Sequence, residues 1–319
     1  MRTLTLRPSR GEIDLPEIAE LINICDDFDH LNQGTSVTEL QVEFTDPQFQ
    51  PERDLRLWEG ANGKLIAFAH LWVPEAEATQ NLGVWFRVLP AERGQGLEEE
   101  ILTWAEAQLR SICAEKGIPG HLTTSVHDTK VDLVALLPKL GFSIVRYFYR
   151  MERSLLDPIP AVALPEGFTV RTLTGEAEVP AWVEAFNQSF IDHWDHHNLT
   201  PNERLHWMTS PTYAPKFDRV VVAPDGTLAG FCYSEIDPES NSRQGQQIGN
   251  VFIVGVRRGF RRMGLGRAIL LSGLHELKAA GMEVARLGVD TQNPNGAKQL
   301  YESVGFSPAV TSIVFRKVL

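Results

Sequence analysis

The chain has 319 residues, 43% hydrophobic and 22% charged, as expected of a globular protein long enough for two domains of about 150 residues. Thirty Lys and Arg face 41 Asp and Glu, so the net charge of −11 disfavours nucleic acid and anionic membranes and favours a cationic ligand such as an amine. Three scattered cysteines, a polar N-terminus and no apolar run of membrane-spanning length lead us to expect a cytoplasmic protein.

The N-terminal half contains three blocks that recur in the same order in the C-terminal half. The paired ranges are 63–73 with 226–236, 88–102 with 256–270, and 136–151 with 300–315. Between the halves, "LLDPIPAVALPEG" holds three prolines and no helical or strand period, which is typical of a linker. We therefore predict an N-terminal domain at 1–155, a linker at 156–165 and a C-terminal domain at 166–319.

The C-terminal half carries a regular succession of predicted elements. They are strands at 219–223, 228–236, 250–256, 284–290 and 311–319, and helices at 266–281 and within 294–306. The stretch 250–256 is almost continuously apolar, as in a central buried strand, and Gly281 is a helix-ending residue. Each half is thus predicted to be a mixed α/β domain with a mostly antiparallel central sheet flanked by helices.

A basic, glycine-containing turn, "VRRGFRRMGLGRAIL", joins the central strand to the following helix. Free N–H groups and the positive end of the macrodipole make a helix N-terminus a site for anions, usually phosphate. Gly264 and Gly266 let the backbone approach a ligand closely, and Arg261, Arg262 and Arg267 add positive charge. The turn therefore predicts a local anion site.

Two common phosphate-binding sequence motifs are not present in this turn. The G-x-x-x-x-G-K-[ST] loop is absent, and Ile269 stands where a dinucleotide fingerprint has its third glycine. What remains, Arg261-x-x-Gly264-x-Gly266, resembles the acetyl-CoA pyrophosphate loop of the GCN5-related N-acetyltransferase (GNAT) superfamily. "NPNGAKQLYESVGF" is similar to a second signature of that superfamily, and "SFIDHW" resembles a stretch of its tandem members. The chain therefore resembles a tandem GNAT with the two-domain arrangement of mycothiol synthase.

The resemblance implies a site for acetyl-CoA, as acyl donor, in the C-terminal domain. Backbone groups of the central strand, chiefly at Val254 and Val256, would pair with pantetheine. Tyr301 would act as general acid toward the departing thiolate, a proton transfer that a phenol can supply. The full set of implied cofactor-binding residues is Val254, Gly255, Val256, Arg261, Arg262, Met263, Gly264, Leu265, Gly266, Arg267 and Asn293. Asn293 has a second interpretation, as the cap of the helix that follows.

The general base has three open interpretations. Asn250 stands near the place where such enzymes often carry Glu, and its amide could hold a water but cannot take a proton. Glu235, on the preceding strand, is the nearest plausible carboxylate, although a surface residue at a strand end is an equal alternative. A neutral amine would need no base at all.

The histidine-rich stretch "DHWDHHN" also allows several interpretations. His193, His196 and His197 have helical spacing, but no second ligand group anchors a metal, and we expect none. The stretch is either a polar helix end or part of an acceptor site formed by Asp192, His193 and Trp194.

The two halves are not equivalent. Glu98 replaces the glycine that matches Gly266, and a carboxylate there would repel a pyrophosphate; Leu137 replaces Tyr301. We therefore expect a degenerate N-terminal domain and N-acetyltransferase activity toward an amine-bearing small molecule or peptide in the C-terminal one. The alternative is a CoA-binding sensor or scaffold without turnover. The expected assembly is a monomer or homodimer.

Overall fold

The computed structural model forms two compact units. It describes residues 4–31, 34–46, 48–74, 79–194 and 196–319. The N-terminal unit consists of 1–146 with 312–319, and the C-terminal unit of 147–311. The division therefore runs through strands β6 (Ser143–Ser154) and β12 (Ser307–Val318), because each strand ends in the other half's sheet. The predicted linker at 156–165 instead lies wholly inside the C-terminal unit.

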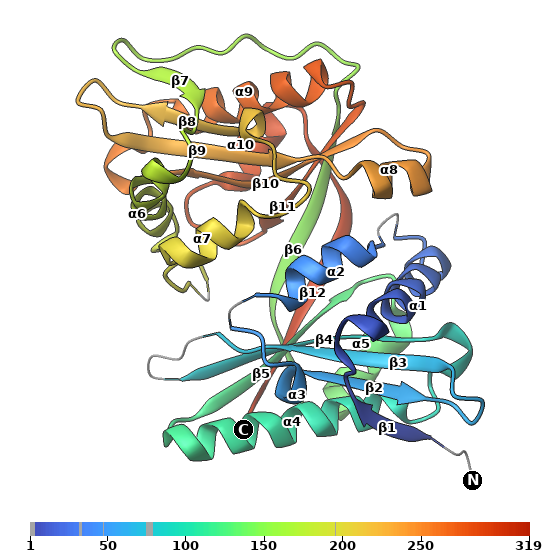
Figure 1. Ribbon diagram of the computed structural model, residues 1–319. Coiled ribbons are helices and arrows are strands. Elements are labelled where there is room, and N and C mark those ends of the chain that lie inside the picture. The colour runs from blue at the N-terminus through green and yellow to red at the C-terminus, as the bar shows by residue number, and fades with distance from the viewer. Residues whose placement is uncertain (1–3, 32–33, 47, 75–78, 195) are drawn as a thin grey trace. The chain divides into compact units, whose positions relative to one another are not determined.

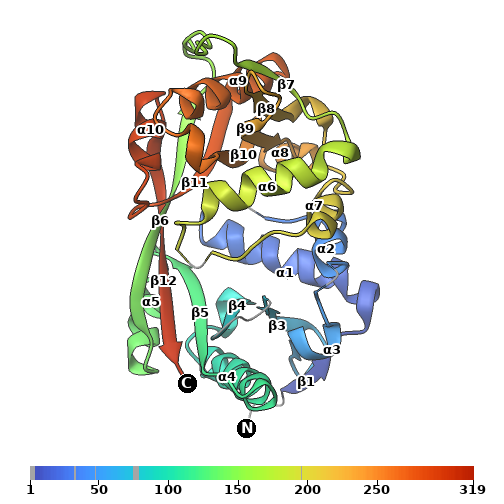
Figure 2. The ribbon, with the colours of Figure 1, turned by 90° about the vertical axis from the view of Figure 1, so that its left-hand side faces the viewer.

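The N-terminal unit is a sheet with helices on both faces. Its strands run in the order β1 (Thr5–Pro8), β2 (Leu55–Glu59), β3 (Leu65–Trp72), β4 (Gln80–Val88), β5 (Gly120–His127) and the end of β12. Neighbours are antiparallel except β4 and β5, which are parallel. The helices are α1 (Leu15–Phe28), α2 (Val37–Phe44), α3 (Pro51–Asp54), α4 (Leu97–Lys116) and α5 (Val131–Lys139). Helix α4 covers one face, and α1 and α2 cover the other (Figure 2).

The C-terminal unit repeats this plan. Its strands run in the order β6, β11 (Val284–Asp290), β10 (Ile248–Val256), β9 (Leu228–Glu235), β8 (Asp218–Val222) and β7 (Thr169–Thr172). Only β10 and β11 are parallel among these pairs. The helices are α6 (Val179–Phe190), α7 (Pro201–Trp207), α8 (Pro238–Gln244), α9 (Leu265–Ala279) and α10 (Ala297–Ser303). The predicted fold class, two mixed α/β domains with mostly antiparallel sheets, is confirmed.

Two apolar cores lie on opposite faces of the C-terminal sheet. Helix α9 packs on one face, where Cys232 of β9 joins its core, and α6 packs on the other, where Phe231 joins Trp182 (Figure 1). Adjacent strand residues point to opposite faces, so Tyr233 and Glu235 lie on the α6 face with Phe231. This alternation places Glu235 on the face of the sheet opposite to the α9 core, which contains Tyr301.

The segment predicted as a linker is fixed against α9. His275 Nε2 lies 3.0 Å from the Pro160 carbonyl oxygen, and Lys278 Nζ donates to the Asp157 carbonyl over 3.0 Å. Residues 155–168 form neither helix nor strand, as the lack of a helical or strand period between Leu155 and Gly167 indicates. Despite its three prolines, the segment therefore packs as part of the C-terminal unit.

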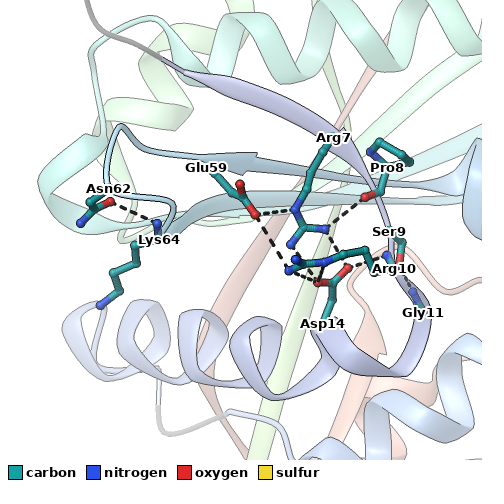
Figure 3. Close-up of polar contacts among 9 residues, drawn as sticks. All are labelled: Arg7, Pro8, Ser9, Arg10, Gly11, Asp14, Glu59, Asn62 and Lys64. Carbon is teal, nitrogen blue, oxygen red and sulfur yellow. Dashed lines mark hydrogen bonds and ion pairs between the residues drawn. The ribbon is translucent and has the colours of Figure 1, made fainter.

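Both units begin with the same ion-paired turn. In the N-terminal unit, Arg7 of β1 donates two 2.8 Å hydrogen bonds to the buried Asp14 carboxylate, which also accepts from Arg10, while Arg7 contacts Glu59 (Figure 3). In the C-terminal unit, Arg171 of β7 makes the matching bidentate contact with Glu178, at 2.8 and 2.6 Å. These turns are a fourth repeat block, "TLRPSRGEIDLP" against "TVRTLTGEAEVP", which the sequence analysis did not find.

Candidate functional site

Strands β10 and β11 separate halfway along their length. They pair only from Ile248 to Val251 on β10, after which β11 pairs with β6 alone and β10 with β9 alone. The Arg257 N–H donates to Ala229 of β9 at 2.9 Å. Because an antiparallel strand directs alternate residues to its partner, the N–H groups of Val254 and Val256 point away from β9, toward the opening. The opening therefore presents backbone donors that have no strand partner within the described part of the chain.

A tight turn closes the wide end of this opening. Helix α9 begins after Gly264, whose φ of 82° is left-handed, and Arg262 has a φ of 64°. The start of α9 carries no side-chain cap within the described residues, so its first N–H groups face outward. At Gly266 a Cβ would lie 3.3 Å from Leu300, so only a glycine fits there without a shift. Leu265 anchors the turn by its burial, and Met263 is exposed.

Arg261 is engaged by the protein itself. Its guanidinium donates to the Ser189 carbonyl at 2.8 Å, to Asp192 at 2.8 Å and to Asn295 at 3.0 Å. Asp192 also contacts Arg258, and the hydrogen bond from Arg261 holds the pKa of Asp192 below its ordinary value. The structure thus joins Arg261, predicted to bind the donor, to Asp192, predicted to bind the acceptor.

Arg267 and Arg262, also in this turn, have fewer hydrogen-bond partners than Arg261. Arg267 donates to the Ser303 carbonyl at 3.0 Å and to its hydroxyl at 2.7 Å. Arg262 is exposed, and within the described residues its guanidinium has no hydrogen bond or ion pair, which leaves its charge available to an anion at the start of α9.

Tyr301 lies on the α9 face of the sheet. It is 7% exposed and belongs to the core formed with α9 and β11. Burial raises the pKa of its phenol well above the ordinary value of 10, and the nearby Cys232 thiol adds to the shift. Among the described residues no hydrogen bond is found for its hydroxyl. The group therefore stays protonated and free to donate.

Glu235 lies on the opposite face, at the end of β9. Its carboxylate accepts hydrogen bonds from Thr212 at 3.2 Å and Tyr233 at 3.3 Å, and it stands across from Asn250 on β10. Burial raises its pKa above 4.5, although the Thr212 and Tyr233 hydroxyls oppose that shift. Tyr301 and Glu235 thus lie on opposite faces of the sheet, one as a protonated phenol and the other as a carboxylate of enhanced basicity. Glu235 is level with Asn250, just before the point where β10 and β11 separate.

The remaining predicted residues have local partners. The Asn293 side chain accepts the Asn295 N–H at 2.8 Å, which supports the turn before α10. His193 Nδ1 lies 2.9 Å from the Trp194 carbonyl oxygen, and the Trp194 ring lies 6.3 Å from that of Phe148. Helix α6 ends at Phe190, so the histidines do not continue a helix; Asp195 lies outside the described residues. Over the described ranges, no three His, Cys, Asp or Glu side chains gather as metal ligands.

The matching turn of the N-terminal unit contains its own carboxylate. Glu98 is 7% exposed and lies 3.2 Å from the Gly94 nitrogen, whose N–H donates to it. Arg93 contacts Asp29 and the Val88 carbonyl, as Arg261 contacts Asp192 and the Val256 carbonyl. The arginine brace is therefore common to both units, whereas a side-chain anion occupies only the N-terminal turn.

Several residues around Glu235 were missed by the sequence analysis. They are Arg204, Thr212, Tyr213, Tyr233 and Phe252. Tyr233 had a signal, since its spacing of two from Glu235 in a predicted strand puts both on one face. Thr212 and Tyr213 lie in irregular backbone without a motif, and only the fold brings them to β9.

Comparison with known proteins agrees with this geometry. Residues 179–306 match the acetyltransferase (GNAT) family. A mycothiol acetyltransferase of Thermobispora bispora is 32% identical over 214 residues, which cover 63% of this chain and 72% of the relative. The mycothiol acetyltransferase of Frankia alni is 27% identical over 322 residues, or 96% of this chain and 92% of the relative.

Solved structures with the same fold cover the whole chain. A GCN5-related N-acetyltransferase from Sphaerobacter thermophilus aligns over 99% of this chain and 95% of its own, with a TM-score of 0.77 and 22% identity. A tandem GNAT protein from the clavulanic acid biosynthesis pathway aligns over 99% and 98%, with a TM-score of 0.72 and 14% identity. None of the described helices is long and apolar enough to cross a bilayer. The chain belongs to the GCN5-related N-acetyltransferase (GNAT) family and is an N-acetyltransferase with a tandem arrangement of two units of that fold.

Proposed function

We propose that the C-terminal unit transfers an acetyl group from acetyl-CoA to the amine of a small molecule. The observation that carries this proposal is the opening between β10 and β11, with Tyr301 on one face and Glu235 on the other. Its shape suits an extended donor with a phosphate end. The outward N–H groups of Val254 and Val256 can pair with amide carbonyls, and the uncapped start of α9 favours a pyrophosphate.

The residues of the turn divide the work of binding. Backbone donors from Arg262 to Arg267 face the pyrophosphate, with the Arg262 side chain adding charge. Arg261 and Asp192 brace the turn against α6 and thereby fix those donors. Asn293 shapes the turn before α10, close to Asn295, which Arg261 also contacts. His193 and Trp194 follow the end of α6 and come directly after Asp192 in the chain.

The chemistry follows from the two titratable groups. Glu235 removes a proton from the acceptor ammonium, so that the neutral amine attacks the thioester carbonyl. Tyr301 donates its proton to the sulfur as the C–S bond breaks, and the extra proton of the attacking nitrogen returns to the tyrosinate, which gives the amide and the free thiol of CoA. The relatives named mycothiol acetyltransferase support a small amine as acceptor, and the amine precursor of mycothiol is the first one to test.

The test is release of free thiol from acetyl-CoA with a library of primary amines that includes this precursor. We expect amine-dependent release by the wild type and by Glu98→Gly, and none by Gly266→Glu, which places a carboxylate at the start of α9. Release that persists in folded Gly266→Glu, or loss in Glu98→Gly alone, would place the activity elsewhere.

A further inference from the structure

Phe252 is an aromatic residue that is exposed in the interior of a central strand. Its side chain is 52% accessible although it lies in β10. It is nevertheless not loose, because its ring packs at 5.6 Å and 77° against Trp207 and at 5.5 Å and 61° against Tyr233. Edge-to-face contacts of this kind fix the orientation of a ring. Part of the Phe252 side chain is thus held by the protein, while about half of it is exposed.

A β-bulge directs this ring outward. The register between β10 and β9 shifts between Val251 and Ile253, so that Phe252 has no residue opposite it on β9. A bulge can turn one side chain out of the regular alternation, and this occurs often beside active sites. The N-terminal unit provides an internal comparison, since β3 and β4 pair without a shift and the repeat-equivalent residue, Val84, is buried.

A buried ion pair supports the rings behind Phe252. Arg204 of α7 and Asp218 of β8 are both fully buried and paired. The Arg204 guanidinium carbon lies 4.2 Å from the Trp182 ring centroid and 5.3 Å from that of Tyr233. Such a pair needs close partners to offset its desolvation. The ion pair joins α7, which carries Trp207, to the sheet that carries Tyr233.

Tyr233 connects the Phe252 ring to the candidate base. The Tyr233 hydroxyl donates to Glu235 at 3.3 Å while its ring contacts Phe252. Asn250, opposite Glu235, is two residues from Phe252 along β10. An ammonium group at the Glu235 carboxylate would therefore have its substituent beside the exposed part of the Phe252 side chain.

We propose that Phe252, supported by Trp207 and Tyr233, is a stacking subsite for a flat apolar group attached to the acceptor amine. The favoured acceptors are primary amines whose aryl group lies within a few bonds of the nitrogen, in preference to short polar amines. This inference rests on the proposed function, because it assigns the acceptor side of that site.

The kinetic test compares benzylamine with ethanolamine as acceptors. In the wild type we expect kcat/KM to favour benzylamine, and Phe252→Ala to reduce that preference by about tenfold without changing the KM for acetyl-CoA. Phe252→Tyr keeps the ring and should keep the preference. The matched control is Phe28→Ala, which removes an exposed phenylalanine from the N-terminal unit and should change nothing.

A binding measurement separates this inference from the proposed function. Saturation-transfer NMR in the presence of CoA should show magnetisation passing from the protein to the benzylamine ring in the wild type and in Phe28→Ala, but not in folded Phe252→Ala. Equal transfer in all three proteins, no transfer in the wild type, or an unchanged amine preference in Phe252→Ala would overturn the subsite. Transfer as expected with no acetylation of any amine would instead overturn the proposed function and leave the subsite standing.

Discussion

At the scale of single residues, burial raises the pKa of both candidate catalytic groups, and the consequence differs for each group. It raises the pKa of the Tyr301 phenol, which keeps the phenol protonated at neutral pH while making it a weaker acid, and it raises the pKa of the Glu235 carboxyl, which makes the ionised form a better acceptor of protons. One physical effect, loss of hydration, therefore keeps the phenol protonated on one face of the sheet and makes the carboxylate a stronger base on the other.

Tyr301→Phe should lower kcat by roughly 10²–10⁴-fold while acetyl-CoA affinity changes little, because the ring and its packing remain and only the proton is lost. A single-turnover rate is the appropriate measurement, since slow product release would hide the effect. An acetyl donor with a more acidic thiol should partly rescue the variant. A wild-type single-turnover rate in the folded variant would remove Tyr301 from the mechanism.

The pH dependence should report Glu235. A base acts only when ionised, so kcat/KM for the amine should fall as the pH drops through a raised Glu235 pKa, above the ordinary value of 4.5. Thr212→Val removes a hydroxyl that stabilises the carboxylate, and the acid limb should move to higher pH. Glu235→Gln should abolish that limb together with most of the activity. An acid limb at the same pH in the wild type and Thr212→Val would argue against this assignment.

At the scale of elements, the fourth repeat block shows that the opening turn of each unit is held by charge. Arg7 with Asp14 and Arg171 with Glu178 both join a first strand to the following helix at a spacing of seven residues. The pKa of each carboxyl is lowered to about 2; in Asp14 these hydrogen bonds outweigh the opposing effect of burial. The turn is thus stabilised when its carboxylate is ionised.

Asp14→Asn should destabilise the N-terminal unit by on the order of 2 kcal/mol at neutral pH. Because the folded pKa lies below the ordinary 3.8, this stability is present above about pH 4 and is lost as the pH falls toward 2. Urea unfolding at pH 7 and at pH 2.5 should therefore show a gap between wild type and variant that narrows in acid. Glu12→Gln, an exposed neighbour, is the control; a gap of equal size at both pH values would contradict the ionic origin.

Sequence patterns predicted the elements well where one physical signal dominated. The strand at Val284–Asp290 has the predicted bounds, and the helix predicted from Gly266 begins at Leu265. The patterns failed where long-range contacts decide. No local signal showed that Arg261 would bond to Asp192, 69 residues earlier, or that Thr212 would reach Glu235. Such contacts depend on which strands become neighbours, which hydrophobic period alone does not determine.

At the scale of the whole molecule, we predict one acetyl-CoA site per chain. The N-terminal unit keeps the arginine brace and the separation of its parallel strands after Gly83, but Glu98 already occupies its turn and Leu137 stands in place of the tyrosine. Calorimetry should give a stoichiometry near one, with binding lost in Gly266→Glu and nearly unchanged in Glu98→Gly. Two equivalent sites would contradict this asymmetry.

The exchange of β6 and β12 between units has a consequence for how the chain is made. The N-terminal sheet takes Ile313 and Phe315 into its core, and Ser312 pairs with His127, 185 residues earlier. A nascent chain on the ribosome cannot complete its first unit until the residues of the second have been synthesised, and closing so long a loop slows folding. Cleavage at 156–165 would likewise yield two fragments that each lack one strand of their sheet, so neither unit is complete without residues from both halves of the chain.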